Sequence, residues 1–154
     1  MAARALTAAL VALVAGCGGE DRLSKAEYES RMQRVAATLQ TSTDRLGGQA
    51  SNPRDTRAAA TALAWLGRAL ERAADGVDDL EPPEEVEKPH DSFVAGLRAF
   101  AGDMRKVAAL ARRGDRLQIQ AFANGLSSLA STRRIARASA EIKRKGYDIA
   151  PGGT

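Results

Sequence analysis

The sequence is poor in cysteine, histidine and aromatic residues, and each shortage excludes a class of protein. The only cysteine is Cys17, so the chain has no intramolecular disulfide and must be stabilised by packing alone. The only histidine is His90, whereas most metal sites take three or four donors, so we expect no metal and no other cofactor. Aromatic residues make up 4% of the chain and strand-type runs are absent, which together with abundant alanine and arginine predicts an all-α fold.

A long hydrophobic run is also missing. The most apolar stretch extends from Ala5 to Ala15, with Thr7 as its only polar side chain. This is far short of the roughly 20 residues that a helix needs to cross a bilayer. A single positive charge at Arg4, a short apolar run and the small residues that follow it are typical of a secretory signal peptide.

The apolar stretch closes with Val-Ala-Gly-Cys, from Val14 to Cys17. This tetrapeptide resembles the lipobox of bacterial, actinobacteria-like lipoproteins, whose last residue is a lipid-bearing cysteine. The resemblance implies cleavage between Gly16 and Cys17 and a diacylglyceryl thioether on Cys17, with acyl chains such as palmitate. We therefore expect a signal peptide over residues 1–16 and a lipidated cysteine with a flexible tether over residues 17–22. Two or more acyl chains would hold the protein stably at the extracytoplasmic face of the cell membrane.

Apolar residues at helical spacing divide residues 23–146 into four segments. Cap and turn residues separate the segments, with Asp115 as a predicted N-cap and Gly146 as a stop signal. The boundaries are Gly47–Gly48, Asn52–Pro53, Pro82–Pro83, Gly114–Asp115 and Gly146. The stripe of the fourth segment consists of Leu117 or Ile119, Phe122, Leu126, Leu129, Ile135 and Ile142.

The connections between the segments are short, which favours antiparallel neighbours. The sequence therefore predicts one domain over residues 23–146, an antiparallel up-down-up-down four-helix bundle, followed by a flexible tail over residues 147–154. The alternative is a looser helical hairpin that completes its core by dimerising. A core rich in alanine buries little apolar area per residue, so we expect only modest stability.

Bundle topology would bring the tether, the acidic run between Asp75 and Glu87, and the basic triplet Lys143–Lys145 to one end. These opposite charges could neutralise one another, or the basic triplet could touch anionic lipid headgroups. The other end would carry arginines that could attract anionic envelope polymers. Because the chain is expected to be exported, its isoelectric point near 9.6 does not indicate nucleic-acid binding.

Three residues are candidates for ligand binding: His90 on the apolar stripe of the third segment, Glu87 one turn earlier, and Trp65 on the second. A histidine on such a stripe is more often a core residue with one nitrogen hydrogen-bonded than a ligand. A proline pair followed by a histidine and a helix resembles small helical envelope lipoproteins. No nucleophile elbow and no phosphate-binding glycine loop is present, so we do not expect an enzyme.

The sequence therefore predicts a lipid-anchored extracytoplasmic helical module with a binding or structural role at the cell envelope. Its expected partners are the membrane, through the lipid on Cys17, and anionic envelope polymers or another envelope protein. The alternative function is a sensory or ligand-binding bundle that holds a small molecule or a metal near His90.

Overall fold

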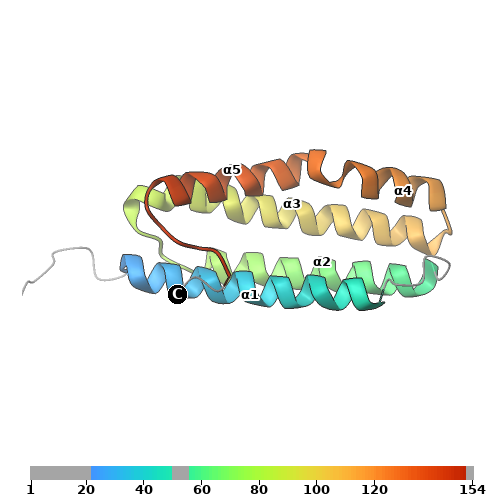
Figure 1. Ribbon diagram of the computed structural model, residues 1–154, viewed down its shortest axis with the longest axis horizontal. Coiled ribbons are helices and arrows are strands. Elements are labelled where there is room, and N and C mark those ends of the chain that lie inside the picture. Colours follow the sequence, from blue (N-terminus) through green and yellow to red (C-terminus); the bar gives the residue numbers. More distant parts are fainter. Residues whose placement is uncertain (1–21, 50–55, 152–154) are drawn as a thin grey trace, which may run out of the picture.

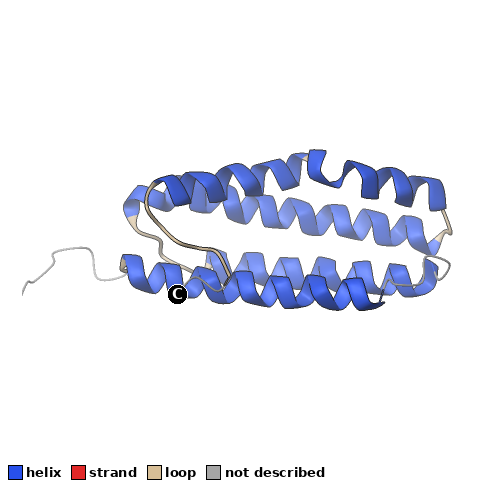
Figure 2. Cartoon of the chain, in the orientation of Figure 1, coloured by secondary structure: helices blue, strands red, loops and turns tan. Residues whose placement is uncertain are grey.

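The computed structural model describes residues 22–49 and 56–151, with the side chains of residues 45–49 excepted. This part of the chain is all-helical and contains no strand (Figure 2). Two short 3₁₀ turns, η1 and η2, accompany five α-helices. The elements are α1 (Lys25–Gln49), α2 (Thr56–Asp78), η1 (Glu84–Val86), α3 (Glu87–Arg112), α4 (Arg116–Gly125), η2 (Leu126–Ser128) and α5 (Ala130–Arg144).

The helices lie alongside one another, with α2 and α3 sharing the most extensive contact (Figure 1). Helix α1 packs against α2, whereas α4 and α5 pack against α3. The start of α1, the connection between α2 and α3, and the end of α5 meet at one end of the molecule (Figure 1). A backbone hydrogen bond from Leu23 N to Glu81 O, 2.9 Å long, joins the first two of these.

Local capping explains where several helices begin and end. Ser24 and Glu27 form a capping box at the start of α1, in which each side chain accepts a hydrogen bond from the other residue's backbone N–H. The predicted cap at Asp115 is confirmed, because its carboxylate accepts a hydrogen bond from Gln118 N at 3.2 Å. Gly146 has a φ of +87° and ends α5 as predicted.

Two predicted boundaries differ from the structure. Helix α1 continues through Gly47 and Gly48 to Gln49, because glycine inside a helix costs only about 1 kcal/mol. Helix α3 begins at Glu87, after the 3₁₀ turn, and not at Pro83. The predicted start at Asn52–Pro53 lies outside the described residues.

The fourth segment is interrupted, contrary to the prediction of one stripe. Leu129 is extended, with φ of −60° and ψ of 142°, and it separates η2 from α5. Residues on both sides of the break still contact the core, because Phe122 and Ile135 are both partly buried against it. Of the two residues predicted to begin the stripe, Leu117 is 86% exposed and Ile119 is half-buried. Leu126 is 39% exposed, whereas Ile142 is fully buried.

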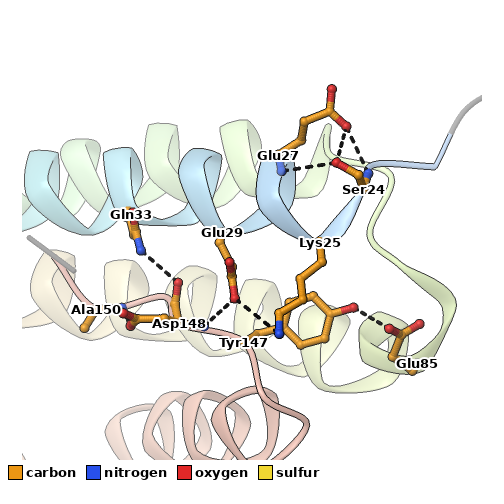
Figure 3. A network of polar contacts seen from close by, with 9 residues as sticks. All are labelled: Ser24, Lys25, Glu27, Glu29, Gln33, Glu85, Tyr147, Asp148 and Ala150. Atoms are coloured by element: carbon orange, nitrogen blue, oxygen red, sulfur yellow. Dashed lines mark hydrogen bonds and ion pairs between the residues drawn. The ribbon is translucent and has the colours of Figure 1, made fainter. Parts of the chain in front are cut away.

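Residues 147–151 pack against α1, although the sequence predicts a flexible tail over residues 147–154 (Figure 3). Residues 152–154 of that predicted tail lie outside the described residues. The N–H of Tyr147 donates to the carbonyl of Ile142 and that of Gly146 to the carbonyl of Lys143, which together make a Schellman motif. The motif turns the chain back and buries Tyr147, which is 3% exposed. We call residues 147–151 the C-terminal strap.

Polar contacts hold the C-terminal strap on α1. The side-chain amide of Gln33 donates to the carbonyl of Asp148 at 3.0 Å, and the N–H of Asp148 donates to Glu29 at 2.9 Å (Figure 3). Ile149 adds apolar contact with the core. The C-terminal strap therefore covers α1 and α5 together.

Candidate functional site

The last residue of the predicted tether, Arg22, is fixed to the connection between α2 and α3, whereas residues 17–21 lie outside the described residues. Arg22 donates to the carbonyl of Pro82 at 3.1 Å and forms an ion pair with Glu87 at 3.0 Å. The Glu87 carboxylate raises the pKa of Arg22. Glu87, one of the candidate ligand-binding residues, is therefore already engaged by the N-terminal segment.

The predicted lipidation and cleavage residues, Gly16 and Cys17, lie outside the described residues. Within the described part of the chain, no helix is both long enough and apolar enough to cross a membrane. Among the same residues, no group of three or more histidine, cysteine, aspartate or glutamate side chains lies close enough together to hold a metal ion.

His90 is buried in the core, 2% exposed, and contacts α1 and α2. Its Nδ1 lies 3.2 Å from the hydroxyl of Tyr28, and the carbonyl of Val77 accepts a hydrogen bond from the same ring. Burial lowers the pKa of His90, against the opposing attraction of the Asp91 and Asp78 carboxylates. A neutral ring with its proton directed at Val77 accepts the Tyr28 hydroxyl proton, so both ring nitrogens are satisfied.

Tyr28 connects this histidine to the C-terminal strap. The Tyr28 ring centroid lies 5.7 Å from that of His90 and 5.6 Å from that of Tyr147, which it meets edge-on at 88°. The Tyr147 hydroxyl donates to Glu85 in the connection between α2 and α3. Three segments far apart in the sequence thus meet in one aromatic cluster, Tyr28–His90–Tyr147.

The charges at this end of the molecule alternate in sign. Lys25 pairs with Glu29 at 4.0 Å and lies 5.3 Å above the ring of Tyr147 (Figure 3). The hydrogen bond from Tyr147 lowers the pKa of Glu85. A nearby hollow of about 750 Å³ is lined by side chains of both signs, among them Glu84, Glu87, Lys88, Glu141 and Lys145. The acidic connection and the end of the basic triplet Lys143–Lys145 therefore lie close together, as mutual neutralisation requires.

Trp65 lines a groove between α1 and α2 of about 470 Å³, which we call the α1/α2 groove. Its polar lining includes three arginines and a threonine: Arg31, Arg34, Arg72 and Thr38. Its apolar lining is formed by Val35, Ala69, Ala73, Gly76 and Leu80 together with the indole of Trp65. The structure thus separates the three predicted ligand-binding residues. Trp65 lies in this groove, Glu87 at the hollow near the tether, and His90 in the core.

The three groove arginines were not identified from the sequence. A signal was present on α1, where Arg31, Arg34 and Thr38 recur at three- and four-residue spacing beside the apolar stripe. Arg72 gives no such local signal, because it reaches the groove only through the packing of α2 on α1.

A second groove, of about 360 Å³, lies between α1, α5 and the C-terminal strap. Its lining is mainly apolar and includes Met32, Val35, Leu39, Phe93, Ile149 and Pro151. Because Val35 contributes to both grooves, α1 separates them.

No protein-family model, no curated protein and no solved structure matches this chain. A function for the chain therefore has to be inferred from its own residues.

Proposed function

We propose that this chain is a lipid-anchored extracytoplasmic helical module with a binding or structural role at the cell envelope, and that it performs no catalysis. Residues 1–16 would be removed as a signal peptide, and the lipid on Cys17 would hold the protein at the membrane. The observation that carries this proposal is the attachment of Arg22 and Leu23 to the connection between α2 and α3. These contacts fix the place at which a tether would leave the folded domain.

The attachment also implies an orientation. Cys17 precedes Arg22 by five residues, and five extended residues reach at most about 17 Å. The end that carries the mixed charges would therefore lie next to the bilayer, and the arginines Arg112, Arg113 and Arg116 at the end of α3 and the start of α4 would face outward. Outward arginines suit anionic envelope polymers or another envelope protein as partners.

We further propose that the helices form an antiparallel up-down-up-down four-helix bundle. The successive contacts α1 with α2, α2 with α3, and α3 with α5 support this topology, as do the short connections. The alternative, a hairpin completed by dimerisation, would use the apolar groove between α1 and α5.

Replacing Cys17 by serine tests the anchor. In intact cells supplied with a clickable palmitate analogue, the wild-type chain should be labelled and fractionate with membranes. Cys17→Ser should abolish both the label and the membrane fraction. A Cys17→Ser/Ala26→Cys double variant is the matched control, because it restores one cysteine at an exposed position outside the Val14–Cys17 pattern. Membrane-bound, acylated Cys17→Ser protein would refute the proposal.

The second candidate function is a sensory or ligand-binding bundle. A site at His90 would have to displace the hydrogen bonds with Tyr28 and Val77. The α1/α2 groove favours this class of function more directly, since Trp65 and three arginines line it.

A further inference from the structure

The α1/α2 groove combines positive charge with an apolar floor. Arg31, Arg34 and Arg72 contribute three guanidinium groups, and none of the described residues that line the groove carries a carboxylate. Glu71, the acidic neighbour of Arg72, is paired with Arg105 on α3. The charge of the groove is therefore not neutralised from within, and it is complementary to an anion.

The carboxylates on the far side of Arg72 have their own partners. Arg98 on α3 pairs with Asp75 at 3.2 Å and with Asp78 at 2.8 Å. These acidic side chains of α2 are paired with arginines of α3, and Arg72 borders both the groove with α1 and the hollow that Glu71 and Asp75 line. Because no described carboxylate lines the α1/α2 groove itself, the groove is basic.

Positive charge and apolar surface are unevenly distributed along the groove. On α1 the lining extends from Arg31 to Ser42, about 16 Å at 1.5 Å per residue. The arginines of α1 lie at the beginning of this stretch, toward the tether, and on α2 the indole of Trp65 lies seven residues, about two turns, before Arg72. The small side chain of Ala69 and the absence of a side chain at Gly76 leave space at the bottom of the groove.

We propose that the α1/α2 groove binds an anionic amphiphile, a phosphate group joined to an alkyl or acyl chain. Guanidinium groups bind phosphate oxygens in a bidentate manner, and three of them can surround one phosphate. The chain of the ligand lies along Val35 and Ala69 toward the indole of Trp65, which offers a large apolar surface. The volume of about 470 Å³ falls in the range of small-molecule sites, about 300–1,000 Å³.

This inference deepens the binding role proposed above, and it is tested without reference to the anchor. Trp65 is the only tryptophan of the chain and lines the groove, so its emission responds to binding there. The full chain carrying Cys17→Ser, in detergent-free buffer, is titrated with dodecyl phosphate below the concentration at which it forms micelles. We expect a saturable shift of the emission to shorter wavelength. Inorganic phosphate and uncharged dodecyl maltoside should each bind at least tenfold more weakly.

Two variants locate the binding in the groove. Arg34→Gln/Arg72→Gln should weaken dodecyl phosphate binding at least tenfold, whereas the matched pair Arg133→Gln/Arg137→Gln on α5 should leave it unchanged. Gly76→Leu should also weaken binding at least tenfold, because the new side chain fills the groove. A Cβ at Gly76 has no atom within 4 Å, so the first carbon of the new side chain meets no clash, and circular dichroism checks that the variant is folded.

Several outcomes would overturn the proposal. Equal affinity for dodecyl maltoside would make the groove an ordinary apolar surface, and equal affinity for inorganic phosphate would make it a site for free phosphate. Unchanged binding in both Arg34→Gln/Arg72→Gln and Gly76→Leu would place the ligand elsewhere. None of these results depends on the lipidation of Cys17. The proposed anchor and the proposed groove ligand can therefore each be refuted without refuting the other.

Discussion

The hydroxyl of Tyr28 lies 3.2 Å from Nδ1 of His90, across 62 residues of sequence, and this contact joins α1 to α3. Both side chains are buried, and Tyr28 is completely so. Removing one partner of such a buried hydrogen bond destabilises the fold, because the other partner stays buried with neither water nor a protein group to bond. The pair therefore contributes directly to the attachment of α1.

Removing the hydroxyl should weaken the fold. Tyr28→Phe keeps the ring contacts and leaves Nδ1 of His90 without a donor, so we expect the free energy of unfolding to fall by about 1–2 kcal/mol. Urea denaturation followed by circular dichroism measures this change. Tyr147→Phe is the matched control and should cost less, because its partner Glu85 is exposed and can be hydrated instead. Equal losses in the two variants would show that His90 does not depend on Tyr28.

The lowered pKa of His90 predicts a pH dependence of stability. Between its folded pKa and the unfolded value of about 6.5, the unfolded chain binds the proton more readily. The contribution of His90 is therefore complete above pH 6.5 and is lost as the pH falls through the folded pKa. Comparison of wild type with His90→Gln, by urea denaturation between pH 7.5 and 5, should show a steeper decline for wild type. Parallel pH curves would contradict the lowered pKa.

The two tyrosines should resist ionisation in the folded state. Burial raises the pKa of Tyr28 and, together with the hydrogen bond to Glu85, raises the pKa of Tyr147 to about 12. Stability from these groups is complete below pH 10 and is lost as the pH rises through the raised values. Tyrosinate absorbance should therefore appear only above about pH 11, together with the loss of helical circular dichroism. The chain in urea is the control, with a midpoint near pH 10.

Two glycines of α3 should respond to alanine in opposite directions. A Cβ at Gly96 would lie 2.7 Å from Cγ1 and 3.2 Å from the backbone N of Ile135, so α5 would have to move. Gly96→Ala should cost about 1–3 kcal/mol of unfolding free energy. At Gly102 the nearest atom is the end of the Arg105 side chain, 3.9 Å away, so Gly102→Ala should gain about 0.5–1 kcal/mol from helix propensity. A gain in both variants would mean that α3 and α5 pack less closely than described.

Much of the helical structure could be predicted from local signals. The cap at Asp115, the stop at Gly146 and the burial of His90 all follow from residues within one or two helical turns. The break between η2 and α5 could not be predicted in this way, because the extended residue there, Leu129, is neither a proline nor a glycine.

The candidate site was predicted less well than the helices. Trp65 and Glu87 were grouped with His90, yet each faces a different neighbour in the structure. The place of a residue in an apolar stripe shows which face of its helix is buried, but it does not show which neighbouring helix covers that face. Arg72 illustrates the same limit, since only the packing of α2 on α1 brings it to the groove that Arg31 and Trp65 line.

The sequence by itself determined the helical class of the described chain, several of its helix ends and the burial of His90, because periodicity and capping are local. It also carries the Val14–Cys17 pattern from which the anchor is proposed. Only the tertiary structure decided that Tyr28 meets His90, that Tyr147 meets Glu85, and that Arg72 lines the same groove as the arginines of α1. These placements bring together residues from about 40 to more than 60 positions apart, and no short sequence pattern specifies them. They form when the helices pack their apolar faces against one another, and this packing depends on the whole chain.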